Sequence, residues 1–288
     1  MLSFFLIFFS SFVSSNTSYE FYGVLKLNGK EESAISYKIV FTESNGKING
    51  YSITDITGEH ETKNIIAGTY DAKTKILVIS EKNIVYTKST ISDDLFCFVN
   101  FTSKIKLESN KTKLKGDFSG LFKNKKKCIN GTFELIGSST VNKLLQKVNK
   151  RIQKSDELKT EEKVKYNPIK IFDSLQTQQM SANQNLNIFN NGQKLTFAIW
   201  DNGVEDGDLI NFYHNNQLLL KNYMVTSQKK KLDVLLSGIS NEFVIEAINQ
   251  GSQGLNTAMV VVEGDQSVSF QTNLLEKETA KVTILKQH

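Results

Sequence analysis

The chain has 288 residues, of which 39% are hydrophobic and 23% are charged, and its formal net charge is +5. A chain of this length can bury two separate cores, and its ordinary composition excludes disorder throughout. The positive charge is modest and no dense basic stripe with interleaved aromatic residues occurs, so we expect no nucleic-acid partner.

The first residues, MLSFFLIFFSSFVSSN, have the pattern of an export signal. An apolar run from Leu2 to Phe9 is followed by small residues that end at Ser15. The run is shorter than the roughly 20 apolar residues that a transmembrane helix needs, and no later segment is apolar enough to span a bilayer. We therefore predict a signal peptide over residues 1–15, a secreted or periplasmic mature protein, and no transmembrane span.

Residues 19–137 alternate between apolar and polar side chains with the period of two that strands show. The predicted strands are 22–27, 36–41, 47–54, 64–70, 76–81, 95–101, 112–121 and 129–136. Turn signals such as ESNGKING and YDAKTK separate them, and this favours an antiparallel meander that curls to remove its edges. Glycines at positions 50, 68, 116, 120 and 131 provide the kinks for such curvature. The sequence thus predicts a curled sheet or a lipocalin-like barrel.

Six aromatic residues are candidates for the inside of this barrel: Tyr37, Phe41, Tyr51, Tyr70, Phe98 and Phe118. One interpretation is that they fill the barrel as a packed core. The alternative is that they line a lumen that holds a small apolar ligand.

The two cysteines, Cys97 and Cys128, both lie in this first domain. In an exported protein they are candidates for a disulfide that closes a loop of about 30 residues. The alternative is a pair of buried thiols on strands that never meet. Neither cysteine belongs to a CxxC pair and the three histidines are dispersed, so we expect no zinc site.

Residues 138–185 change to a helical pattern. Apolar residues recur at a spacing of three and four, with basic residues on the other side: Val141, Leu144, Leu145, Val148 and Ile152 against Lys143, Lys147, Lys150 and Arg151. Such a helix docks against a neighbouring domain or lies on a membrane surface. We expect Pro168 to end any helix, and the polar stretch QTQQMSANQNLN to be a flexible lead-in. The segment is predicted to be a partly helical connector.

Residues 186–288 return to strands, predicted at 194–200, 208–214, 217–225, 232–236, 242–248, 257–263, 268–273 and 281–285. Strands of this number and spacing favour a β-sandwich. The pair Asn215 and Asn216 predicts a tight hairpin turn, since asparagine tolerates positive φ. The whole chain is therefore expected to be all-β, with the helical connector between two β domains.

Three segments of this last domain carry a recognisable pattern. It comprises an acidic loop with Asp201, Asn202, Gly203, Asp206, Gly207 and Asp208, a turn with Ala247, Asn249 and Gly251, and a strand start with Asn256, Thr257 and Ala258. Together they resemble a C-terminal domain that recurs in exported proteins of Bacteroidota. Family members often carry prolines where this chain has Gln253, Gly254 and Leu255. The resemblance covers roughly the last third of the chain and implies a β-sandwich module without enzymatic activity.

The acidic loop, WDNGVEDGD, allows more than one interpretation. Oxygen atoms of Asp201, Asn202, Asp206 and Asp208 are candidate ligands for calcium, which takes roughly six to eight such ligands on a turn-rich loop. The loop lacks the spacing of an EF-hand. In the alternative, the same side chains need no metal and hydrogen-bond the backbone of turns and strand starts. Calcium is the only cofactor that the sequence suggests.

No catalytic motif stands out: a nucleophile elbow and a phosphate-binding loop are both absent from the sequence. The sequence favours an exported, non-enzymatic binding or structural protein of the cell envelope or extracellular space, whose partner is an envelope or surface component. The alternative is a carrier of a small apolar ligand, or an enzyme, with its cavity inside the first domain. An open cavity of several hundred cubic ångströms with converging polar groups distinguishes the alternative.

Overall fold

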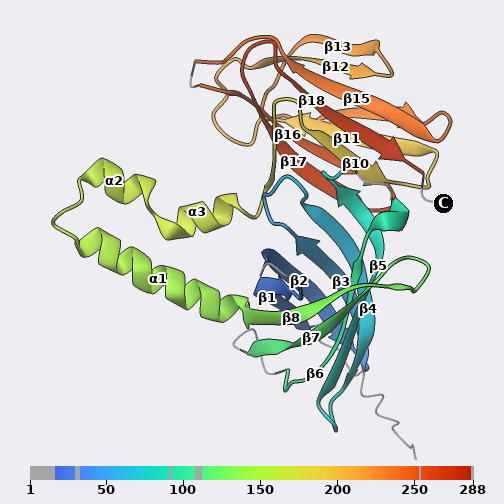
Figure 1. Cartoon of the computed structure of the whole chain (residues 1–288). Helices are drawn as coiled ribbons and strands as arrows, with labels where there is room; N and C mark the ends of the chain where they lie inside the picture. The colour runs from blue at the N-terminus through green and yellow to red at the C-terminus, as the bar shows by residue number, and fades with distance from the viewer. Residues whose placement is uncertain (1–16, 30–32, 91–92, 108–111, 253, 287–288) are drawn as a thin grey trace, which may run out of the picture.

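The computed structural model describes residues 17–29, 33–90, 93–107, 112–252 and 254–286. The signal peptide predicted over residues 1–15 lies outside the described residues. Most of the described chain forms strands, arranged as a barrel, a helical connector and a second group of strands (Figure 1). None of the helices in these ranges is long and apolar enough to cross a membrane.

Eight antiparallel strands close into a barrel, as the sequence predicted. They are β1 (Thr17–Leu27), β2 (Ala34–Ser44), β3 (Lys47–Thr54), β4 (Thr62–Asp71), β5 (Ile76–Thr87), β6 (Phe98–Lys104), β7 (Lys113–Leu121) and β8 (Lys127–Gly137). Each strand pairs with the next, and β8 pairs with β1 to close the ring. A 3-10 turn, η1 (Asp93–Leu95), lies in the connection between β5 and β6.

Glycines let neighbouring strands of the barrel approach closely. A Cβ atom built on Gly50 would lie 2.0 Å from the carbonyl oxygen of Val40, and one built on Gly68 would lie 1.9 Å from that of Val78. Neither position has room for a side chain. This supports the role that the sequence suggested for these two glycines in curving the sheet.

Aromatic rings fill one half of the barrel. Tyr19 stacks on Phe41 with ring centroids 5.4 Å apart, and the rings of Phe101 and Phe133 lie 4.4 Å apart. Of the six aromatic residues expected inside, Tyr37, Phe41 and Phe118 belong to the inner cluster, and Tyr70 packs against it. The other two, Tyr51 and Phe98, do not. Alternation explains the error for Tyr51: its neighbour Ser52 is fully buried and bonds to inward-facing residues, so Tyr51 points outward.

The connector begins with three helices, α1 (Ser138–Lys154), α2 (Thr160–Lys165) and α3 (Pro168–Ser174), none of which has a fully buried residue. Pro168 does not merely end a helix. It occupies the first turn of α3, where the missing N–H costs nothing, and the Asn167 side chain caps the helix by accepting from the amides of Ile169 and Lys170 at 3.0 and 3.3 Å.

The polar stretch after α3 was expected to be a flexible lead-in, and this prediction was wrong. It contains two strands, β9 (Gln178–Ser181) and β10 (Asn185–Phe189). Alternate side chains are buried in each, with Met180 in one and Leu186 and Ile188 in the other. Both strands pair in parallel with strands near the chain's end, so partners remote in sequence decide this structure.

The remaining strands lie close to their predicted ranges. They are β11 (Lys194–Trp200), β12 (Leu209–His214), β13 (Gln217–Met224), β14 (Lys230–Leu235), β15 (Ser240–Ala247), β16 (Asn256–Glu263), β17 (Ser267–Leu274) and β18 (Thr279–Leu285). Asn215 and Asn216 form the predicted turn, with φ values of 47° and 64°. One sheet has the order β14-β11-β16-β17-β9. Phe197 of this sheet lies against Phe243 of β15, which belongs to the other sheet, and their ring centroids are 4.5 Å apart.

The barrel and the C-terminal strands share one continuous sheet. The order β13-β12-β15-β18-β10 continues into β5, because Asn187 and Ile188 of β10 pair with Thr87 and Tyr86. Tyr86 and Thr87 lie at the end of β5, so the C-terminal strands lie against one end of the barrel (Figure 1).

Candidate functional site: a cavity at the barrel mouth

A cavity of about 430 Å³ opens at the end of the barrel where the connections after β1, β3, β5 and β7 gather. Its lining is mostly apolar: Leu25, Leu27, Ile35, Phe96, Cys97, Val99, Phe118 and Ile129, with Thr54, Asp55, His60, Thr62, Asn64, Glu81 and Ser89 as the polar members. A volume of this size lies within the roughly 300–1,000 Å³ of small-molecule sites. The barrel thus combines a packed aromatic core with a cavity at this mouth.

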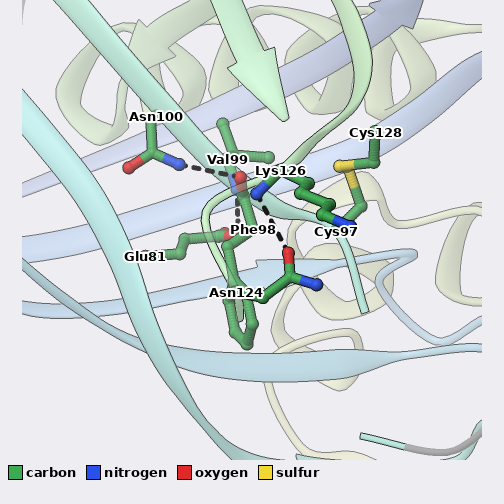
Figure 2. The surroundings of a disulfide bond; sticks show 8 residues. All are labelled: Glu81, Cys97, Phe98, Val99, Asn100, Asn124, Lys126 and Cys128. Carbon is green, nitrogen blue, oxygen red and sulfur yellow. Dashed lines mark hydrogen bonds between the residues drawn. A yellow bond between two sulfur atoms is a disulfide. The ribbon is translucent and has the colours of Figure 1, made fainter. Parts of the chain in front are cut away.

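The most unusual group in this lining is Glu81, which is only 4% exposed. Its Oε1 accepts hydrogen bonds from the Tyr37 hydroxyl at 2.9 Å and the Ser52 hydroxyl at 2.5 Å. Its Oε2 accepts from the Val99 amide at 2.7 Å, as Figure 2 shows. Three strands other than its own therefore hold this carboxyl group in place.

Burial raises the pKa of the Glu81 carboxyl, while the hydrogen bonds from Ser52, Val99, Tyr37 and Asn64 act in the opposite direction. Burial also raises the pKa of the Tyr37 hydroxyl well above its usual value, followed by the effect of the Glu81 charge. Tyr37 consequently keeps its proton and remains a donor to Glu81.

Asn64 adds a second acceptor to the same cavity. Its side chain is 5% exposed, and its Oδ1 atom has no hydrogen-bond partner among the described residues. A buried acceptor without a donor costs about 1–3 kcal/mol. Because Asn64 lines the cavity, a molecule that brings a hydrogen-bond donor to its Oδ1 atom would remove this cost.

The predicted disulfide forms and lies at this mouth. Cys97 precedes β6 and Cys128 is in β8, and their Cα atoms are 6.0 Å apart (Figure 2). Since β7 lies between these two strands in the sheet, the bond crosses over β7. A hydroxyl pair, Thr62 and Thr87 at 2.7 Å, joins β4 to β5 near the same end. Covalent and hydrogen-bonded links thus fix the rim.

The acidic loop lies elsewhere, between β11 and β12. Asp208 is 1% exposed, and its two carboxylate oxygens accept from the amides of Gly251 at 2.9 Å and Thr257 at 2.7 Å. Burial raises the pKa of Asp208, and the charges of Asp206 and Asp201 add to this. Asp201 accepts from the Gly203 amide at 2.7 Å, while its Oδ2 is buried without a partner in the described chain. Asn202 is exposed.

The three motif segments of the C-terminal part meet in one hydrogen-bonded knot, which we call the DGD knot: Asp208, Asn249, Gly251, Asn256 and Thr257. Asn249 accepts from the Leu209 amide at 2.7 Å and donates to the Gly207 carbonyl at 2.9 Å. Asn256 donates to the carbonyls of Leu209 and Asn249, both at 3.0 Å. The side chains therefore bind backbone groups, as the metal-free interpretation requires. Within the described ranges, no group of three or more His, Cys, Asp or Glu side chains is placed to hold a metal ion. Calcium binding by Asp201, Asn202, Asp206 and Asp208 stays a prediction.

The sequence analysis did not single out Glu81 or Asn64. The signal was present, because Glu81 continues the alternate, inward-facing row of Leu77 and Ile79, and Asn64 precedes Ile66 by two. A polar residue at an inward-facing position of a barrel strand marks either a binding site or an internal network.

Comparison with protein-family models, with curated proteins and with solved structures found no match to this chain.

Proposed function

We propose that this chain is an exported, non-enzymatic carrier of a small molecule with an apolar body and a hydrogen-bond donor at one end. The observation that carries the proposal is the largely apolar cavity of about 430 Å³ at the barrel mouth, which is lined by the buried carboxyl of Glu81 and the unpartnered oxygen of Asn64. The alternative function that the sequence left open is thereby favoured over a purely structural role.

The lining specifies the ligand. Apolar side chains such as Leu25, Ile35 and Val99 can cover a hydrocarbon body and remove it from water. This contributes about 25 cal/mol of binding free energy per Å² of buried apolar surface. The unpartnered oxygen of Asn64, which lines the cavity together with the buried carboxyl of Glu81, calls for an N–H or O–H group. A carboxylate beside the Oδ1 atom of Asn64 and the carboxyl group of Glu81 would bring acceptors together with acceptors. The chemistry fits an aliphatic amine or alcohol better than a fatty acid.

We also propose that residues 186–288 form a β-sandwich of the Bacteroidota type and serve as the attachment or structural module. The DGD knot supports this, because the residues of the resemblance, far apart in sequence, are joined through their hydrogen bonds. Export, cleavage after residue 15 and an envelope or surface partner belong to the same proposal.

Titration calorimetry with decylamine, decanol and decanoate tests the carrier function. We expect the amine and the alcohol to bind at least roughly tenfold more tightly than the carboxylate, which corresponds to 1.4 kcal/mol. Ile35→Trp should fill the cavity and weaken binding at least tenfold. Val40→Trp is the matched control, since Val40 lies on the outward-facing row of the same strand. Absence of binding by all three compounds, or unchanged binding in Ile35→Trp, would overturn the proposal.

Glu81→Gln is expected to change how stability depends on pH. A raised pKa means that the folded chain holds this proton more tightly than the unfolded chain does. As pH rises from the ordinary glutamate pKa of 4.5, the unfolded chain ionises first, so Glu81 lowers the free energy of unfolding until its folded pKa is passed. The glutamine variant lacks this loss. Urea unfolding between acid and neutral pH should therefore show that the variant becomes more stable relative to the wild type as pH rises. Parallel plots of unfolding free energy against pH would contradict a raised pKa of Glu81.

A further inference from the structure

A second, smaller cavity lies outside the barrel wall and carries a different chemistry. It measures about 150 Å³ and is enclosed between the barrel, the segment after α3 and β17. A row of laterally paired residues on the barrel's outer face contributes Lys38, Ile53, Lys63 and Tyr86 to it. The opposite wall contains Gln176, Gln178 and Ser269. We call this space the junction cavity.

Gln178 contributes an unpaired carboxamide to the lining of the junction cavity. The residue is 7% exposed, and neither its Oε1 nor its Nε2 has a hydrogen-bond partner in the described part of the chain. A buried carboxamide has one end that accepts and one that donates, whichever way it is turned. Leaving both ends unpaired is costly, so the group that belongs here both donates and accepts hydrogen bonds.

The charge in the cavity is positive on the side of the barrel. The Lys63 ammonium lies 4.3 Å from the centre of the Tyr51 ring, and no acidic side chain of the described residues lies within salt-bridge distance of it. Burial lowers the pKa of Lys63, and the charge of Lys38 adds to this. Lys38 itself pairs with Glu20 at 3.0 Å.

The acidic group in the lining, Glu61, is already satisfied. Its two oxygens accept from the Tyr86 hydroxyl at 2.8 Å and the Thr57 amide at 2.6 Å. Of the two lysines in the lining, Lys38 is therefore already paired with Glu20, whereas Lys63 has no ion pair among the described residues. A cavity of 150 Å³ has the volume of about five water molecules, at roughly 30 Å³ each, and so admits an ion of about five non-hydrogen atoms.

We propose that the junction cavity binds a phosphate group, with Lys63 as the cation that faces it and the Gln178 carboxamide as its hydrogen-bond partner. Hydrogenphosphate meets both requirements, because it carries the negative charge that Lys63 needs and both accepts and donates the hydrogen bonds that Gln178 needs. Its oxygens accept from the Lys63 ammonium and from the amide nitrogen of Gln178, and its O–H donates to the amide oxygen. Sulfate has the same size and the same acceptors but no O–H. This site is independent of the barrel cavity, so it stands or falls separately from the carrier function.

Thermal unfolding in phosphate, sulfate and chloride at equal ionic strength tests the proposal. At a phosphate concentration about ten times the Kd, we expect the midpoint to rise by roughly 3–6 °C relative to chloride, with a smaller rise in sulfate. Methyl phosphate distinguishes two sources of the phosphate group. If it raises the midpoint as much as inorganic phosphate does, the cavity accepts the phosphate group of an organic molecule. If it raises the midpoint less, the ligand is the free ion.

Two variants and one control make the result specific. Lys63→Met should abolish the phosphate-dependent rise, and Lys115→Met, which changes an exposed lysine of β7, should leave it unchanged. Gln178→Met should abolish the rise too, yet it should unfold at the same or a higher temperature than the wild type in chloride, because it removes an unpaired buried amide. Equal phosphate effects in the wild type and in Lys63→Met, or a cavity that water alone satisfies so that no anion shifts the midpoint, would overturn the proposal.

Discussion

Asp208→Ala is expected to lower the free energy of unfolding by roughly 2–5 kcal/mol, which is one of the largest effects that a single substitution in this chain should have. The carboxylate accepts from the amides of Gly251 and Thr257, and it is 1% exposed. Alanine leaves both amides without their acceptor. Relief of the buried charge offsets part of this cost, since burial raises the pKa of Asp208.

Two further variants separate the roles of Asp208. Asp208→Asn keeps one acceptor but places an N–H group against the other amide, so we expect about half the loss. Asn202→Ala changes an exposed side chain of the same loop and should alter stability by less than about 0.5 kcal/mol. Urea unfolding measures all three. Similar losses for Asp208→Ala and Asn202→Ala would mean that the DGD knot does not hold the C-terminal strands together.

Calcium binding by the same loop can be tested separately. If the oxygens of Asp201 and its neighbours bind the ion, calcium must raise the unfolding midpoint relative to chelator, since it binds the folded form only. The hydrogen bonds of Asp208 are directed at amides, so we expect the midpoint to be the same in millimolar calcium and in chelator. A rise that Asp201→Asn abolishes would establish the metal site instead.

The barrel could be predicted because its strands alternate in a simple way and follow one another through short turns. Ser52, Glu81 and Asn64 were overlooked because only the closed ring brings their strands together around one point. Alternation also breaks in β5. Asn64 pairs with Ile84 whereas Ile66 pairs with Glu81, so β5 carries extra residues opposite β4. A bulge of this kind leaves no clear signal in one sequence, and the residues that follow it, Tyr86 and Thr87, are those that pair with β10.

The strands β9 and β10 were missed for a related reason. Their polar residues, such as Gln178 and Asn187, meet partners that come from distant parts of the chain. Asn187 donates to the Ser89 carbonyl at 3.0 Å, which joins β10 to a residue that lines the barrel mouth. The interface between the two halves is therefore built from side chains that a local pattern assigns to solvent. Both candidate cavities lie beside this interface, because it is where the regular packing of each half ends.

Replacing both cysteines, as Cys97→Ala with Cys128→Ala, is expected to destabilise the chain by roughly 3–4 kcal/mol, because the bond joins residues 31 positions apart and restricts the unfolded chain. For a protein of this size the midpoint should fall by roughly 6–16 °C. Thermal unfolding with and without reductant measures the effect, and reductant should affect only the wild type. The bond lies at the rim of the cavity, so binding of decylamine should weaken as well.

Gly120 makes this prediction specific to the geometry of the bond. A Cβ atom at Gly120 would lie within 3 Å of the sulfur atoms of both Cys97 and Cys128, because the bond crosses β7 at this residue. We expect Gly120→Ala to cost about 1–3 kcal/mol in the wild type, the usual range for an overpacked site. The cost should be smaller in the variant without cysteines, where the sulfur atoms are gone. A double-mutant cycle measures this difference, and equal costs in both backgrounds would show that Gly120 serves the curvature of β7 and not the passage of the disulfide.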